Sequence, residues 1–312
     1  MTHRGLGVAS MGKASRTKVE STRREKIAAQ RAAERRSEQR RRILIASGSV
    51  VVVLVIVLVF VIVKLNGKPA ASAQGVSNGP TGSSLAAVVN NVTSVPASTL
   101  NTVGQGGGTV TGKPTTISGT TLTENGKPEM FYLGAEYCPY CAAERWAMIV
   151  ALSRFGTFSG LSTVHSSSTD VYPNTPTWTF YKSSYTSPYL TFTPVETTTN
   201  VADASNTPPY VTLQTPTAAQ QALITKYVGA SGSIPFIDFG NKYLISGASY
   251  NPALLAGLSW STIATDLSNP SSPVAQAVDG TANYITAAIC KMTGNQPASA
   301  CTTAVQSLES QI

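Results

Sequence analysis

Apolar positions are distributed unevenly along the chain, and the longest uninterrupted run lies near the N-terminus. Residues Ile43 to Val63, "ILIASGSVVVVLVIVLVFVIV", are 21 consecutive positions without a charge. A helix rises about 1.5 Å per residue, so this run spans the roughly 30 Å hydrocarbon core of a bilayer. We therefore predict one transmembrane helix over 43–63. A cleaved signal peptide is the alternative, because "ASA" at Ala71–Ala73 resembles a cleavage site.

All of the net charge of +8 arises before that run. Residues 1–42 hold 13 Lys and Arg against four Glu, whereas residues 43–312 hold 10 Lys and Arg against 11 Asp and Glu. Positive flanks stay in the cytoplasm. We predict a basic cytoplasmic tail, a single-pass anchor in the cell membrane, and an extracytoplasmic part from residue 64 onward. Binding of the tail to nucleic acid or anionic lipid is a weaker alternative, and no nucleic-acid partner is predicted.

The segment after the apolar run is poor in large apolar residues. Residues 64–112 are rich in Gly, Ser, Thr, Asn and Ala, a composition that predicts a flexible extracytoplasmic linker. Within it, Ser84–Val92 ("SLAAVVNNV") holds enough apolar residues for one or two helical turns that dock on the following domain. We predict that this domain occupies residues 113–312.

Strand and helix patterns alternate from the start of the domain. An Asn-Gly turn at 125–126 predicts a hairpin, and the largely apolar segment Glu129–Ala135 predicts a buried strand. Good helix formers then continue from Pro139 to Gly156. The pattern "GLSTVHSSS" (160–168) predicts a second strand, expected to neighbour the first.

The later part of the domain has fewer regular patterns. Residues 170–216 are rich in Thr, Tyr, Ser and Pro and predict a long insertion of strands and loops. A helix capped by Thr215 or Thr217, a hairpin turning at Gly240-Asn241 and further helices follow. Alternation of strands and helices, followed by an antiparallel pair, predicts an α/β fold with a mixed sheet flanked by helices.

Two cysteines, Cys138 and Cys141, lie where the first strand meets its helix, in "GAEYCPYCAAERW". A C-x-x-C pair at a helix start can form a disulfide, and the helix N-terminus stabilises a thiolate on the first sulfur. We predict that Cys138 is the nucleophile and that Cys141 resolves the mixed disulfide. A permanent structural disulfide is the alternative, because exported cysteines are usually structural.

The other two cysteines, Cys290 and Cys301, flank a loop that contains Gly and Pro. We predict a structural disulfide that closes this loop; a second redox pair that relays electrons is the alternative. Zinc bound by all four cysteines is disfavoured, because ten residues separate this pair instead of the usual two to four. No metal is predicted.

The residues around Cys138 resemble a known family. "MFYLGAEYCPYCAAERW" is similar to the active-site strand and helix of the thioredoxin superfamily, with the Pro-Tyr dipeptide typical of glutaredoxins. "SGSIPFIDFGNKYLISGAS" resembles the segment in which that superfamily places a cis-proline facing the redox pair, followed by a hairpin. The resemblance implies a thioredoxin-like domain and a substrate cleft formed by Pro139, Tyr140, Ile234 and Pro235. More narrowly, "AEYCPYCAAERWA" resembles an uncharacterised membrane family, domain of unknown function 929.

The chain departs from the superfamily pattern in two places. Tyr132 stands where reductases carry a buried acid, although Glu136 and Glu144 are close in sequence. Also, 92 residues separate Cys141 from Ile234, so the insertion is long. It is expected to cover the active site or to bind a partner.

These features together predict a membrane-anchored extracytoplasmic thiol–disulfide oxidoreductase. Its expected partners are thiols and disulfides of exported proteins and a membrane electron-transfer partner. No cofactor is predicted, because the chain has no phosphate-binding G-x-x-x-x-G-K-[ST] motif and no histidine after its C-x-x-C. The alternative is a non-catalytic binding module in which the CPYC pair is a structural disulfide.

Overall fold

The computed structural model describes residues 75–229 and 232–312. The chain divides into two units at residue 62, and the described residues belong to the second unit. The predicted basic tail (1–42) and transmembrane helix (43–63) lie outside the described residues. In the part of the chain that is described, no helix combines the length and the apolar character needed to cross a membrane.

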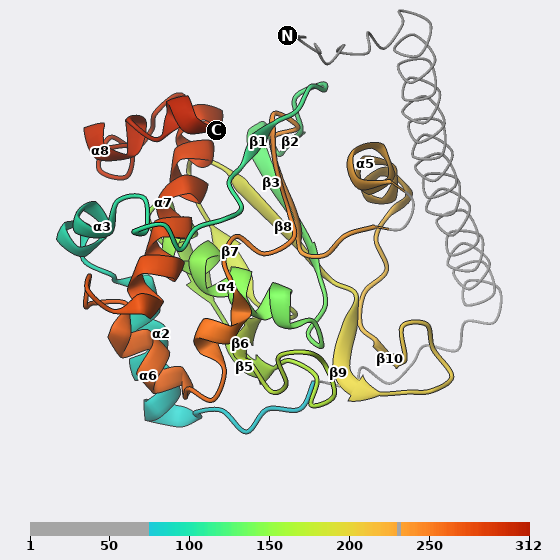
Figure 1. Cartoon of the computed structure of the whole chain (residues 1–312). Coiled ribbons are helices and arrows are strands. Elements are labelled where there is room, and N and C mark those ends of the chain that lie inside the picture. The colour runs from blue at the N-terminus through green and yellow to red at the C-terminus, as the bar shows by residue number, and fades with distance from the viewer. Residues whose placement is uncertain (1–74, 230–231) are drawn as a thin grey trace, which may run out of the picture. The chain divides into compact units, whose positions relative to one another are not determined.

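A mixed sheet of six strands forms the centre of the domain (Figure 1). Strand β3 pairs with β8, which runs parallel to it, and with β11, which runs antiparallel. Strand β12 pairs with β11 and with β1, and β2 forms a hairpin with the start of β3. The bounds are β1 Thr115–Thr116, β2 Thr123–Glu124, β3 Lys127–Gly134, β8 Thr191–Glu196, β11 Phe236–Phe239 and β12 Tyr243–Ser246.

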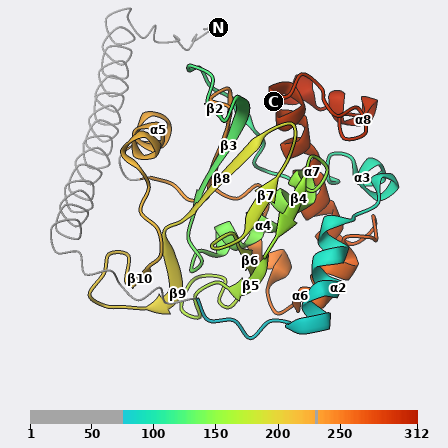
Figure 2. The ribbon, with the colours of Figure 1, turned by 180° about the vertical axis from the view of Figure 1, so that it is seen from behind.

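Helices cover both faces of this sheet. Along β3, Met130 and Tyr132 belong to the core cluster that contains the apolar residues of two long helices. Phe131 and Leu133 belong to a second cluster together with Ile224 of a third helix. Successive side chains of a strand point to opposite faces, so the alternation assigns the helices to two layers. Figures 1 and 2 show these layers, formed by α4 Pro139–Leu152 and α7 Pro273–Met292 on one face and α5 Ala218–Val228 on the other.

Both predicted hairpin turns are confirmed. Asn125 and Gly126 have φ of 53° and 75°, and Gly240 and Asn241 have φ of 65° and 59°. The first loop has two residues, whereas the second has three, 240–242, and Gly240 and Asn241 are the central residues of a turn closed by a hydrogen bond from the Lys242 N–H to the Phe239 carbonyl. Such turns need positive φ at both central positions, which Asn and Gly adopt most readily. The helix cap at Thr217 is also confirmed, because its side chain accepts a hydrogen bond from the Gln220 N–H.

Part of the predicted flexible linker packs against the domain. Residues 82–103 form helices α2 (Gly82–Thr93) and α3 (Ala97–Val103), and Val88, Val92 and Leu100 belong to the main core cluster. Helix α2 lies beside α6 (Trp260–Asp266) in both views (Figures 1 and 2). The docked helical turns predicted at Ser84–Val92 are confirmed. They extend into a second helix, because apolar side chains spaced three or four apart find a buried partner surface.

The second strand does not neighbour the first, contrary to the sequence prediction. Strand β5 (Ser162–His165) pairs with β6 (Pro176–Thr179) in a separate two-stranded sheet. The parallel neighbour of β3 is β8, which lies inside the segment predicted to be an insertion. Two excursions from the central sheet therefore flank the core strand β8 in the sequence. The one before β8 contains β4 Thr157–Ser159, β5, β6 and β7 Ser184–Thr186, and the one after it contains β9 Thr198–Ala202 and β10 Tyr210–Thr212.

Cys290 at the end of α7 and Cys301 in the following loop form a disulfide. This bond is the one that the sequence predicts. It leaves Cys138 and Cys141 as free cysteines, so the four cysteines do not gather in one zinc site. In the part of the chain that is described, no group of three or more His, Cys, Asp or Glu side chains is placed to hold a metal ion.

Candidate active site

Cys138 and Cys141 lie at the first turn of α4, directly after the loop that follows β3. Cys138 is the N-cap residue of the helix, and its Sγ accepts a hydrogen bond from the Cys141 N–H at 3.3 Å. Pro139 follows at the first helical position, where its fixed φ suits the helix and its missing N–H is not needed. The strand-to-helix junction predicted from the sequence is therefore confirmed.

The two thiols have different environments. Cys141 has no exposed surface and Cys138 has 5%. Hydrogen bonds from the Cys141 thiol and backbone N–H, together with the positive charge of Arg145, lower the pKa of Cys138. Burial raises the pKa of Cys141. A thiolate therefore forms first on Cys138, the sulfur that is nearer to solvent.

The segment before β11 lies against the Cys138–Cys141 pair. The side chain of Ile234 packs on the cluster that contains Ala135, Cys138 and Cys141. The Ile234–Pro235 peptide bond is cis, which agrees with the expectation drawn from the family resemblance. The Pro235 carbonyl accepts a hydrogen bond from the Gly247 N–H at 2.8 Å, which ties this segment to the end of the following hairpin.

An open groove of about 480 Å³ lies beside the CPYC loop. Two of the predicted cleft residues, Tyr140 and Ile234, line it, whereas Pro139 and Pro235 are buried beneath the surface. Tyr140 is 40% exposed. None of the described residues that line the groove is charged; they are Thr111, Tyr140, Tyr172, Ser233, Ile234, Gly247, Ala248, Tyr250, Asn251 and Pro252.

The excursions around β8 supply aromatic residues to this site. Tyr172 contacts Tyr140 edge to face, with ring centroids 5.9 Å apart. Tyr210 of β10 stacks on Tyr137 with ring centroids 4.3 Å apart, and its hydroxyl bonds to Ser167 at 2.8 Å. Composition indicated that the insertion is rich in tyrosine, but only the tertiary structure shows which tyrosines reach the CPYC loop.

The acid expected from the superfamily is replaced by a buried tyrosine. Tyr132 has no exposed surface, and its hydroxyl has no hydrogen-bond partner among the described residues. Glu136 and Glu144, which the sequence placed nearby, are also fully buried, and burial raises the pKa of each to about 7. Glu144 accepts hydrogen bonds from the N–H and hydroxyl of Ser249 at 2.8 and 2.9 Å.

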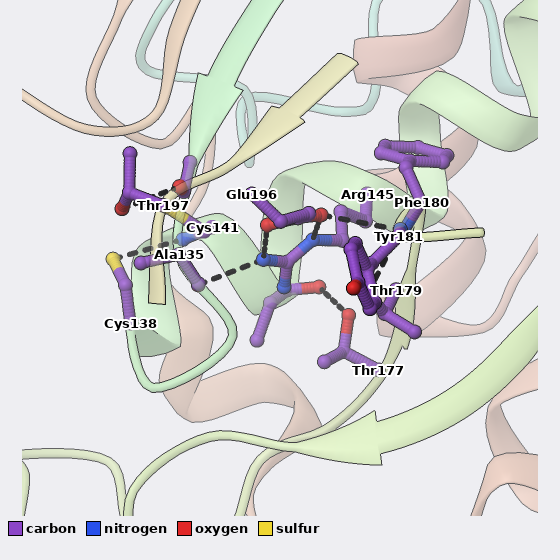
Figure 3. A network of polar contacts seen from close by, with 12 residues as sticks. Ala135, Cys138, Cys141, Arg145, Thr177, Thr179, Phe180, Tyr181, Glu196 and Thr197 are labelled. Carbon is purple, nitrogen blue, oxygen red and sulfur yellow. Dashed lines mark hydrogen bonds and ion pairs between the residues drawn. The ribbon is translucent and has the colours of Figure 1, made fainter. Parts of the chain in front are cut away.

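Beneath the CPYC loop, residues 135–141, lies an ion pair that the sequence analysis missed. The guanidinium of Arg145 on α4 binds the carboxylate of Glu196, at the end of β8, through two hydrogen bonds of 2.7 and 2.8 Å. Both side chains are fully buried. Figure 3 shows the guanidinium between Glu196 and the carbonyl of Ala135, close to Cys138 and Cys141. The sequence spacing could have placed Arg145 near the two cysteines, because positions 138, 141 and 145 share one helical face.

Comparison with known proteins places the chain in a family. Residues 113–291 match the model described as Domain of unknown function (DUF929). The chain belongs to the DUF929 family. No curated protein and no solved structure matches it.

The DUF929 match includes nearly the whole candidate site. It begins just before β1 and ends within α7, so it contains the sheet, both free cysteines, the Arg145–Glu196 pair and nearly all of the groove. Helices α2 and α3 precede it, and Cys301 follows it. The narrower family resemblance seen in the sequence is therefore confirmed, and the function has to be argued from the site itself.

Proposed function

We propose that this DUF929 protein is an extracytoplasmic thiol–disulfide oxidoreductase that acts on exported proteins through Cys138 and Cys141. Its domain would be thioredoxin-like and held at the cell membrane by the N-terminal apolar segment 43–63. Tyr140, Ile234 and the neighbouring groove would receive the substrate chain. A membrane electron-transfer partner would exchange electrons with the cysteine pair between cycles.

The observation that carries this proposal is the contrast between the two pairs of cysteines. Cys290 and Cys301 are bonded to each other, whereas Cys138 and Cys141 are free at a helix N-terminus. In the free pair, the pKa of the outer thiol is lowered and the pKa of the inner thiol is raised. Exchange needs this division of roles, because one sulfur attacks while the other waits as a thiol.

The chemistry follows from these positions. The Cys138 thiolate attacks one sulfur of a substrate disulfide, which forms a mixed disulfide and releases one substrate thiolate. Cys141 then loses its proton and attacks the Cys138 sulfur, which forms the Cys138–Cys141 disulfide and releases the second substrate thiolate. Two electrons pass from the pair to the substrate, the proton lost by Cys141 goes to one released thiolate or to solvent, and the other thiolate takes its proton from solvent. Run in reverse, the same steps oxidise a substrate dithiol.

The arrangement of strands supports the thioredoxin-like part of the proposal. The strand before the cysteines, β3, pairs with a parallel strand on one side and with an antiparallel hairpin, β11–β12, on the other. A helix follows the cysteines, a second helix lies on the opposite face, and a long helix follows the hairpin. This is the order that the resemblance around Cys138 and Pro235 implies.

The reduction potential of the Cys138–Cys141 pair tests the proposal. The full chain, purified in detergent, is equilibrated in glutathione buffers, and each cysteine pair is followed by mass after alkylation. A potential above about −200 mV supports an oxidase or isomerase, and one between about −230 and −280 mV supports a reductase. A pair that stays oxidised below about −300 mV is a structural disulfide, and the binding-module alternative then replaces the enzyme.

A second readout is the trapping of substrates. In Cys141→Ser, the mixed disulfide on Cys138 cannot be resolved, so exported proteins should accumulate in covalent complexes that reducing agent releases. The matched variant Cys138→Ser, which lacks the attacking sulfur, should trap none. Equal capture by the two variants would contradict the assigned roles.

A further inference from the structure

Burial of the Arg145–Glu196 pair beneath the CPYC loop carries a large desolvation penalty. Both side chains have no exposed surface, and removal of two charges from water costs several kcal/mol per ion before their attraction is counted. Apolar residues of similar volume often stabilise a core equally well. A buried ion pair is therefore weak evidence for a stabilising role, and its position suggests another one.

The guanidinium is attached to the backbone of the CPYC loop. Arg145 Nη2 donates to the Ala135 carbonyl at 2.7 Å, and the same carbonyl accepts the Cys138 N–H at 3.3 Å. Arg145 also lies four residues after Cys141 on α4, so the two side chains project from the same helical face. Figure 3 shows the guanidinium on the side of the helix that carries the cysteines.

The charge of this guanidinium acts on both thiols. Its attraction lowers the pKa of Cys138 and opposes the burial that raises the pKa of Cys141. A buried charge is poorly screened, so its effect is larger than that of a surface residue. The other ionisable groups around it are Glu196 on β8, Tyr132 on β3 with its ring centroid 5.9 Å away, and Glu136 in the loop.

We propose that Arg145 is a positioning residue that sets the reduction potential of the Cys138–Cys141 pair, and that Glu196 limits this effect by neutralising part of the charge. The inference rests on the proposed exchange function and adds a mechanism for tuning it. The positive charge favours the reduced pair, because only the reduced pair carries a thiolate. The Arg145–Ala135 hydrogen bond holds that charge at a fixed position relative to the loop.

Two substitutions with opposite expected effects test the proposal in the full-length protein. Arg145→Met removes the charge, so the equilibrium constant for oxidation by glutathione disulfide should rise about tenfold, which is a fall of about 30 mV in potential. Glu196→Gln leaves the guanidinium without its counter-charge and should shift that constant in the opposite direction. The pH at which Cys138 reaches half-maximal alkylation should rise in the first variant and fall in the second.

Controls separate an electrostatic effect from a structural one. Arg154, just beyond the other end of α4, is also largely buried, and Arg154→Met should leave both readouts unchanged. The double variant Arg145→Met/Glu196→Leu leaves no unpaired buried charge, so it should fold even if Arg145→Met does not. It should still show the raised half-maximal pH at Cys138.

The outcomes distinguish this inference from the proposed function. A native Cys138 that reacts as a low-pKa thiol, with no change in the double variant, overturns the role of Arg145 and leaves the exchange function standing. Shifts in the same direction in Arg145→Met and Glu196→Gln also overturn it, because they indicate a common loss of structure. A native Cys138 that is inert removes the proposed function itself.

Discussion

At the scale of single residues, Asp279 of α7 is the buried acid with the simplest surroundings. It has no exposed surface, and neither carboxylate oxygen has a hydrogen-bond partner among the described residues. Burial raises its pKa to about 8. An ionised carboxylate in this position would lack compensation, so the folded protein holds Asp279 in its neutral form below that pH.

The sign of the resulting pH dependence follows from linkage. The unfolded chain ionises Asp279 near its ordinary pKa of 3.8, whereas the folded protein keeps the proton up to about pH 8. The folded state therefore binds more protons between these values, and the free energy of unfolding falls as the pH rises from about 4 to 8. Glu136 and Glu144 contribute with the same sign between about pH 4.5 and 7.

We predict that Asp279→Asn removes the contribution of this residue. The variant should gain stability relative to the parent as pH rises, by an amount on the order of several kcal/mol between pH 5 and pH 9, since each pKa unit corresponds to about 1.4 kcal/mol. Urea unfolding of both proteins at these two pH values measures it. The same stability difference at both values would contradict the buried, protonated state of Asp279.

At the scale of elements, α2 and α3 are part of the folded domain although they precede the DUF929 match. Leu100 of α3 is only 2% exposed. The Asn283 amide of α7 donates to the Leu100 and Gly104 carbonyls at 2.8 and 2.9 Å, which fixes the end of α3 against α7. A chain that begins at residue 113 would lose these contacts and expose the apolar face of α7.

We predict that Leu100→Ala lowers the free energy of unfolding by about 2–5 kcal/mol, the range for buried leucines. The matched control is Asn101→Ala on the exposed side of the same helix, which should change stability little. Denaturant unfolding compares the two. If both variants were as stable as the parent, α3 would not be an integral part of the domain.

At the scale of the whole molecule, the Cys290–Cys301 disulfide joins α7 to the C-terminal segment. The bond spans 11 residues of sequence. Closing a loop of that size removes unfolded-state entropy worth about 3 kcal/mol. The bond lies outside the groove and its lining residues, so its expected role is structural.

We predict that Cys290→Ala/Cys301→Ala loses about 3 kcal/mol of stability and retains the alkylation rate of Cys138. Thermal unfolding and pH-dependent alkylation of the same preparations measure the two quantities. Normal stability combined with impaired turnover of the Cys138–Cys141 pair would instead favour the electron-relay alternative for this disulfide.

The sequence by itself determined the features that depend on neighbouring residues. The turns at 125–126 and 240–241 and the CPYC helix start are set by local backbone preferences and were predicted correctly, and the cap at Thr217 is one of the two positions predicted. The Cys290–Cys301 pairing was also within reach, because a short loop brings these residues together. The residue types at turns and caps are sufficient to predict these features, since few other backbone conformations suit those residues.

Only the tertiary structure decided which distant segments meet. A strand's neighbour is chosen by packing over the whole sheet, so β8 took the place beside β3 that the sequence pattern gave to β5. The same choice placed Glu196 against Arg145, although the two residues are 51 positions apart in the sequence. The sequence gives no sign that the charge of Arg145 is buried. Burial becomes possible only when the folded chain brings the carboxylate of Glu196, from another element, against the guanidinium.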